Sequence, residues 1–415
     1  MKIGKISILV IIIVILIFKF QTANASTSEL FLGKIFPNDS SINYRFKAIN
    51  FITYPLFATP AIVSPGNTLK ITTTLSPTTH IDKITLQNSH NTIESSFTSN
   101  YDDANQQLLV NFSLPDSART GLYSLFVNTA NENDFTWNSV KITEPFGAQI
   151  SIVHVTDTQI GYEAYSTLKA LTMVVNEINL IRPQPAFAVH TGDLIDGGTT
   201  GNITQRYEDA LTALANLSIP IFIVNGNHEK YANLSYWNTY IGAEYQHSVT
   251  YGPLHLALTA LRDLDGLSPS ELEWVKNDIT SHSRKTTLLG YHYDYGSQFD
   301  SIGADIHLIG HEHRSYVESY TDYVKIVTGN TYWQNDNDLG EIRLLNFVNG
   351  RLESYPILEF GENAPVDPLP PVTTSNPDTS RSSTGVETTK TSQTDLFSVI
   401  LAGVILLIHR KRISP

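Results

Sequence analysis

The chain has 415 residues, of which 41% are hydrophobic, and it carries a formal net charge of −13 with no cysteine. This length predicts two or three domains of about 150 residues each, and the missing cysteine excludes disulfides, thiolate metal sites and cysteine nucleophiles. The acidic balance argues against a nucleic-acid-binding surface, which needs clustered lysine and arginine. Imidazole, amide and carboxylate groups would have to hold any metal.

Residues 1–25 have the pattern of a signal peptide. Two lysines precede an apolar run at 6–18, and Ala23-Asn24-Ala25 places small residues at the spacing that a signal peptidase needs. An uncleaved membrane anchor is the alternative, but the run is short for a span. We therefore expect an exported protein. Five N-glycosylation sequons fit an exported chain: Asn38, Asn111, Asn202, Asn216 and Asn233.

Residues 26–146 are expected to form a small β-sandwich domain after a leader. Short strands such as 108–112 and 122–127 alternate apolar and polar side chains, and turns such as Pro65-Gly66-Asn67 separate the strands. Strands punctuated in this way are typical of a sandwich, and they loosely resemble the immunoglobulin-like modules of surface proteins. His80 and His90 are isolated, so we expect no site in this domain.

Residues 147–360 change to an alternation of strands and helices. Apolar residues three or four apart over 168–178 predict one helix, and the capping box Ser268-Pro269-Ser270-Glu271 opens another. Later strands at 325–328 and 341–347 are expected in a second sheet. The segment is therefore expected to be a mixed α/β sandwich.

Five strand-like runs of this domain end in polar turns. The runs are mostly apolar, as in strands that are covered on both faces. Ligands of open α/β sheets bind outside the carboxyl ends of the strands, so we expect the polar groups of these turns to gather at one edge. In chain order they are Asp157 and Gln159, then Asp193, then Asn227 with His228 and Glu229, then His292, and finally His311 with His313.

Together and in this order, the five turns resemble the calcineurin-like metallophosphoesterase family. The pattern of that family is Asp-x-His, Gly-Asp, Gly-Asn-His-Asp/Glu, His and Gly-His-x-His, and the resemblance covers roughly residues 150–341. It implies a four-layer α/β/β/α sandwich that hydrolyses phosphate mono- or diesters. The reaction would use a hydroxide held between two divalent metal ions.

The resemblance also implies a role for each turn. The first metal would take Asp157, Gln159, Asp193 and His313, and the second would take Asp193, Asn227, His292 and His311. Asp193 would bridge the two metals. His228 would stabilise or protonate the leaving oxygen, and Glu229 would orient or charge His228.

Two positions depart from related patterns. Gln159 stands where the family usually has histidine. An amide oxygen is a harder and weaker ligand than imidazole, so manganese or ferrous iron is favoured over zinc there and the first metal should bind more loosely. Asp196 stands where purple acid phosphatases, which also carry a β-sandwich, have tyrosine, so we expect no ferric–tyrosinate pair.

The remaining candidates are expected to be structural. His154, His190 and His307 lie inside strands, and His255 and His282 have no partner at ligand spacing. Tyr332 belongs to a polar-aromatic loop after a late strand, which makes that loop a candidate for substrate contact.

The C-terminal part changes composition again. Residues 361–394 are rich in Pro, Ser and Thr and are expected to form an extended linker. Residues 395–409 hold an apolar run that predicts a transmembrane or sorting segment, and 410–415 form a basic tail, which favours the cytoplasmic side. The run is shorter than the about 17–25 residues of a spanning helix, so an anchor and a processed signal both stay open.

These features predict an exported, membrane-tethered metallophosphoesterase whose partner is a phosphate ester. The alternative is a non-catalytic surface recognition or adhesion protein with a degenerate phosphoesterase scaffold, and Gln159 favours it. The remaining ligand residues and His228 count against the alternative, because a decayed site should lose its general acid too.

Overall fold

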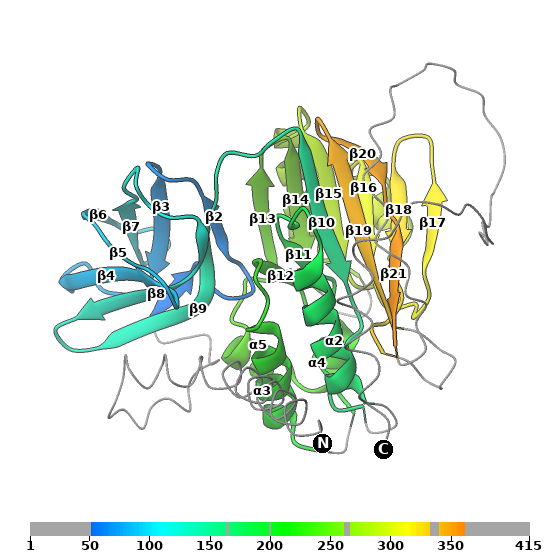
Figure 1. The fold of residues 1–415 in the computed structure, drawn as a ribbon, viewed down its shortest axis with the longest axis horizontal. Coiled ribbons are helices and arrows are strands. Elements are labelled where there is room, and N and C mark those ends of the chain that lie inside the picture. The colour runs from blue at the N-terminus through cyan, green and yellow to red at the C-terminus, as the bar shows by residue number, and fades with distance from the viewer. Residues whose placement is uncertain (1–50, 163–165, 199–200, 261–265, 333–339, 362–415) are drawn as a thin grey trace, which may run out of the picture. The chain divides into compact units, whose positions relative to one another are not determined.

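The structure is a computed structural model that describes residues 51–162, 166–198, 201–260, 266–332 and 340–361 (Figure 1). The predicted signal peptide, the C-terminal apolar segment and the basic tail lie outside these residues, as does the linker after residue 361. Within the described ranges, no helix has the length and apolar character needed to cross a membrane.

The strands of the first part are β1 (Ile52–Tyr54), β2 (Ala61–Val63), β3 (Thr68–Thr73), β4 (Ile81–Gln87), β5 (Thr92–Glu94), β6 (Phe97–Asp102), β7 (Gln107–Ser113), β8 (Gly121–Thr129) and β9 (Asn133–Ile142). They form a four-stranded sheet in the order β1-β3-β7-β6 and a five-stranded sheet in the order β2-β9-β8-β4-β5. Alternate residues of β7, among them Leu108, Val110 and Phe112, are buried in one core with residues of both sheets. The predicted all-β region is therefore present, and its immunoglobulin-like character stays a prediction.

The second part holds twelve strands and six helices among the described residues. The strands are β10 (Gln149–Val155), β11 (Ala188–His190), β12 (Ile221–Ile223), β13 (Gln246–Tyr251), β14 (Leu254–Thr259), β15 (Thr286–Tyr291), β16 (Ile306–Ile309), β17 (Tyr316–Ser319), β18 (Val324–Val327), β19 (Gly340–Val348), β20 (Arg351–Ser354) and β21 (Ile357–Phe360). The helices are α2 (Thr167–Leu180), α3 (Ile203–Leu214), α4 (Asn227–Tyr231), α5 (Leu234–Tyr240), α6 (Pro269–Ser281) and α7 (Ser297–Asp300).

These strands form two six-stranded sheets. The first has the order β12-β11-β10-β19-β20, with β21 also paired to β19, and the second has the order β13-β14-β15-β16-β18-β17. Strand β18 lies in the second sheet as predicted. Strand β19 does not, because it pairs antiparallel with β10 in the first sheet.

Three apolar clusters define the layers of this part. One cluster lies between the sheets and contains Ile152 of the first and Leu288 of the second. Another packs α2, α3 and α5 on the outer face of the first sheet, and the third packs α6 and α7 on the outer face of the second. The result is an α/β sandwich, and its order of helices, sheet, sheet and helices agrees with the four-layer prediction.

Local sequence signals explain where α6 begins. The Ser268 hydroxyl accepts a hydrogen bond from the Glu271 backbone N–H at 3.4 Å, and the Glu271 carboxylate accepts one from the Ser268 N–H at 2.8 Å. This reciprocal pair satisfies two N–H groups that a helix start leaves without partners.

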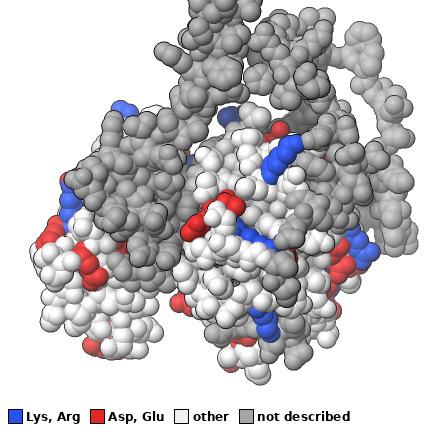
Figure 2. Space-filling view, turned by 90° about the horizontal axis from the view of Figure 1, so that it is seen from below, with Lys and Arg blue, Asp and Glu red and all other residues white. Residues whose placement is uncertain are grey.

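Charged side chains on the face that Figure 2 shows are scattered, with acidic and basic groups of the described residues intermixed.

Candidate metal centre

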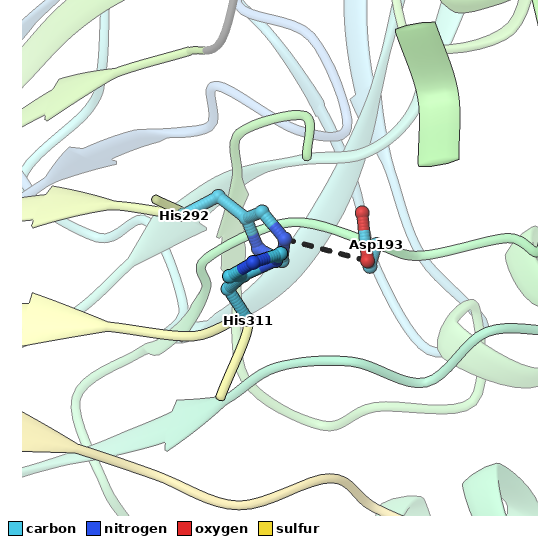
Figure 3. Close-up of side chains that lie close together, drawn as sticks. All are labelled: Asp193, His292 and His311. Carbon is cyan, nitrogen blue, oxygen red and sulfur yellow. Dashed lines mark ion pairs between the residues drawn. The ribbon is translucent and has the colours of Figure 1, made fainter. Parts of the chain in front are cut away.

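The polar turns after β10, β11, β12, β15 and β16 meet at one place. Asp193, His292 and His311 bring ligand atoms within 4.8 Å of one another, as Figure 3 shows for these three side chains. Asp157, Asp193 and His313 form a second group of the same kind. Asp193 belongs to both groups, which is the position that a carboxylate bridging two cations would occupy. The spatial convergence that the sequence predicts is therefore present.

We name the two groups after their most distinctive members. The His292 half contains Asp193, Asn227, His292 and His311, and the Gln159 half contains Asp157, Gln159, Asp193 and His313.

The backbone of the centre adopts an uncommon conformation. Nine non-glycine residues of the described chain have positive φ, and five of them belong to the centre. Side chains make this region costly, so the surrounding fold must hold these residues in place, as is common at functional sites. The five are Asp157 (+52°), Gln159 (+41°), Asp193 (+56°), His311 (+70°) and His313 (+53°).

Two glycines allow the turns to come this close. A Cβ atom at Gly226 would collide with the Asp193 carboxylate, and one at Gly310 would collide with the Thr156 hydroxyl. The latter Cβ would also lie 2.8 Å from the Asp157 carboxylate. Any side chain at either position would therefore displace a carboxylate of the centre.

In the His292 half, three lone-pair-bearing atoms converge. The Nδ1 atom of His292 donates to the Thr191 carbonyl at 2.8 Å, so its Nε2 atom faces the centre. This Nε2 lies 3.3 Å from Asp193 Oδ2 and 3.0 Å from Asn227 Oδ1. Burial alone would lower the pKa of His292, but the carboxylates of Asp193 and Asp157 outweigh it and raise the pKa to about 9. A cation bound at Nε2 would satisfy the same two oxygens.

In the Gln159 half, Asp157 offers a buried oxygen. Its Oδ2 accepts hydrogen bonds from the Thr156 hydroxyl at 2.7 Å and from the His311 N–H at 2.9 Å. Its Oδ1 is buried without a hydrogen-bond partner of good geometry and lies 3.3 Å from His313 Nε2. A fixed carboxylate with one unsatisfied oxygen beside an imidazole fits a divalent cation.

The side chain of Gln159 points its amide nitrogen, and not its amide oxygen, at the other ligand residues of this half. Its Nε2 atom lies 3.4 Å from Asp193 Oδ2 and 3.2 Å from His313 Nε2, while its Oε1 accepts a hydrogen bond from the Tyr332 hydroxyl at 2.7 Å. The structure thus places Gln159 where the sequence predicts it, but the atom that could bind a metal faces Tyr332.

His228 lies at the rim of the centre, with its Nε2 atom 3.8 Å from Asp193 Oδ2 and its side chain 23% exposed. Its partner differs from the prediction. Asp196, not Glu229, contacts the ring, with Asp196 Oδ1 at 2.9 Å from Nδ1, and Arg206 pairs with the same carboxylate at 3.1 Å. The signal that the sequence offered was the position of Asp196 three residues after Asp193.

Glu229 has a different task. Its buried carboxylate accepts backbone hydrogen bonds from Asp193 and Ile195, each at 3.0 Å, and from Gly226 at 2.6 Å. Burial, followed by repulsion from Asp193, raises the pKa of Glu229 to about 7. The side chain therefore ties the turn after β11 to the turn after β12, and the prediction that it orients His228 is wrong.

His154 and His307 are structural, as predicted. His154 is buried between the hydroxyls of Thr191 and Thr328, at 2.8 and 2.7 Å. The Nδ1 atom of His307 lies 3.0 Å from the Tyr291 hydroxyl. These three contacts give both buried imidazoles hydrogen-bond partners without a metal.

A cluster that the sequence did not predict joins His255, Asp278 and His282. The Nε2 atom of His255 lies 2.7 Å from Asp278 Oδ2, and the two imidazole rings stack at 3.6 Å with 8° between their planes. Imidazole lone pairs lie in the ring plane, so the lone pairs of two stacked, nearly parallel rings run side by side and do not converge on one point. In this arrangement the cluster fastens α6 to β14 and does not form a second metal centre.

Comparison with known proteins gives one family. Residues 150–315 match the profile of the calcineurin-like phosphoesterase family. A curated relative, the probable glycerophosphodiester phosphodiesterase GpdQ of Arcobacter nitrofigilis, is 27% identical over 157 residues, which are 34% of this chain and 56% of that protein. The chain therefore spans little more than half the length of that relative.

Two solved structures are also similar. The putative 5'-nucleotidase of Staphylococcus aureus is 14% identical with a TM-score of 0.35, and the match covers 53% of this chain and 56% of that one. GAP50 of Plasmodium is 12% identical with a TM-score of 0.35, and the match covers 52% of this chain and 90% of that one.

Proposed function

We propose, from the premise that residues 150–315 form a calcineurin-like phosphoesterase domain, that this protein is a metal-dependent phosphoric ester hydrolase. The observation that carries the proposal is that Asp193 belongs to both groups of ligand atoms. Two bound cations about 3.5–4 Å apart would neutralise the phosphoryl oxygens and lower the pKa of a coordinated water. Manganese, iron and zinc are the candidate metals, because the available ligands are imidazoles, an amide and carboxylates.

His228 is the residue placed to act on the leaving group. Its Nδ1 is 2.9 Å from Asp196, which orients the ring, and its Nε2 faces the centre next to Asp193. A histidine at this position can hold a proton for the departing oxygen. The buried ion pair between Arg206 and Asp196 holds this carboxylate in place.

The substrate class that we propose is a phosphodiester. The curated relative, 27% identical over 157 residues, is named a probable glycerophosphodiester phosphodiesterase. Monoesters are the second substrate class, because they need the same cations and the same leaving-group assistance. On the sequence pattern of both termini, we further propose that the protein is exported and tethered to a membrane.

Hydrolysis of bis-p-nitrophenyl phosphate and p-nitrophenyl phosphate tests the proposal. The full-length protein should hydrolyse the diester faster, with activity that rises on adding manganese and disappears with a chelator. Activity that survives exhaustive chelation would overturn the metal-dependent mechanism.

The second candidate function is non-catalytic recognition at a cell surface. The orientation of Gln159 favours this second function. Its amide nitrogen faces Asp193, so a cation in the Gln159 half would lack one ligand. No turnover of either ester with manganese, iron or zinc, in protein that binds these metals, would decide for this function.

A further inference from the structure

The contact between Tyr332 and Gln159 joins two distant parts of the chain at the centre. Tyr332 lies beyond β18 and Gln159 follows β10, 173 residues earlier. Their exposed fractions are 2% and 3%, and the Tyr332 hydroxyl donates to Gln159 Oε1 at 2.7 Å. A buried hydrogen bond of this length is costly to break without a replacement.

The neighbours of the other end of the amide fix its orientation. A carboxylate offers only acceptor atoms, so Asp193 Oδ2, at 3.4 Å, suits the amide nitrogen. With no cation between them, the amide oxygen in that place would set two acceptors against each other. The backbone of the turn is also held, because the Gln159 N–H donates to the Asp193 carbonyl at 2.9 Å.

We propose that Tyr332 is a positioning residue that lowers the cation affinity of the Gln159 half by holding the Gln159 oxygen away from it. An amide nitrogen has no lone pair for a metal, so a cation must do without Gln159 or turn the amide over. Turning it over ends the donation from the Tyr332 hydroxyl to Gln159 Oε1 and sets the amide nitrogen against that hydroxyl instead. The His292 half does not depend on this bond, because the Thr191 carbonyl fixes His292 instead.

This inference rests on the proposed function, and Tyr332→Phe tests it. The variant removes the hydroxyl and keeps the ring that packs 6.1 Å from His313. Calorimetric titration of the full-length protein with manganese should resolve two classes of binding site. The class that is lost in the His313→Ala variant is the one that belongs to the Gln159 half. In Tyr332→Phe this class should bind about three- to tenfold more tightly, the effect of one ordinary hydrogen bond. The other class should not change.

Two further variants make the test specific. In a Gln159→His background there is no amide to turn, so Tyr332→Phe should have no effect on affinity, and the double-mutant cycle should show this coupling. Tyr293→Phe removes the hydroxyl of a ring whose centroid lies 4.6 Å from that of His311 in the other half, and it serves as the matched control.

Unchanged or weaker binding in the Gln159 half of Tyr332→Phe overturns the inference and leaves the proposed function standing. Weaker binding would mean that the hydroxyl accepts from the amide and supports Gln159 as a ligand. If the wild-type protein binds no cation, the inference and the proposed function fail together.

Discussion

The two halves of the centre differ in what lies behind the side chain that faces the cation position. Behind His292, the Thr191 carbonyl accepts a hydrogen bond from Nδ1 at 2.8 Å, so Nε2, the atom that could bind a cation, points inward. Behind Gln159, the Tyr332 hydroxyl donates a hydrogen bond at 2.7 Å, so the amide N–H group points inward. The acceptor behind His292 leaves its ligand atom facing the centre, and the donor behind Gln159 holds its ligand atom away from the centre.

This difference shows that residue type alone does not define a metal ligand. Histidine and glutamine each have one end that can bind a cation and another that can donate a proton. The hydrogen bond at the far end decides which one faces the metal. The two halves should therefore differ in affinity, although they share Asp193 and each contains one partly exposed histidine.

Asp193→Ala should remove the distinction between the halves altogether. Both groups of ligand atoms include Asp193, so both cations should be lost and activity should fall to background. Metal analysis of the purified variant and its turnover of the diester measure this. Asp103→Ala, at an exposed turn of the all-β region, is the control and should keep both metals. Retention of one tightly bound cation in Asp193→Ala would contradict the bridging role.

His228→Ala should separate chemistry from metal binding in both halves. His228 lies at the rim, 3.8 Å from Asp193 Oδ2, and Asp196 rather than a cation ligand orients its ring. Both cations should remain, while kcat should fall by about 10²- to 10⁴-fold as for a lost general acid. Metal content and kcat of the same preparation are the two readouts. Loss of metal in proportion to activity would show that His228 is a ligand.

The sequence allowed the convergence of the centre to be predicted, because apolar strands that end in polar turns share one edge in an α/β sheet. It did not allow the direction of the side chains to be predicted. Glu229 is next to His228 in the chain, yet its carboxylate turns back to three backbone N–H groups, and Asp196 takes the contact with the ring. Adjacent residues of a turn point to different sides, so sequence proximity is a poor guide to contact.

Contacts between residues that are far apart in the chain could not be predicted from the sequence, for a related reason. His255 and His282 have no partner at ligand spacing in the chain, but β14 and α6 bring them together on Asp278. Strand β19 carries an apolar pattern that fits either sheet, and pairing with β10 decides between them. Tyr332 reaches Gln159 only because β18 and β10 end at the same edge.

The gain in the free energy of unfolding on cation binding should show which half binds its cation more weakly. A cation present at about 100 times its Kd adds about 2.7 kcal/mol to the free energy of unfolding. We expect His313→Ala, which leaves the His292 half intact, to keep more of the manganese-induced gain than His292→Ala. Denaturant unfolding of both variants, with manganese and with chelator, measures the two gains. A larger gain in His292→Ala would reverse the order of affinities.

Gln159→His should make the two halves more alike, with the smallest effect of the four predictions. An imidazole in place of the amide gives the Gln159 half a softer and stronger ligand, which should tighten zinc more than manganese. We expect an increase in zinc affinity of about tenfold in this half, close to the effect of one good ligand contact. Parallel titrations with zinc and manganese compare the two metals in one preparation. Two equally tight zinc sites in the wild-type protein would show that the hydrogen bond behind Gln159 has no bearing on affinity, and the contrast between the halves would then lie elsewhere.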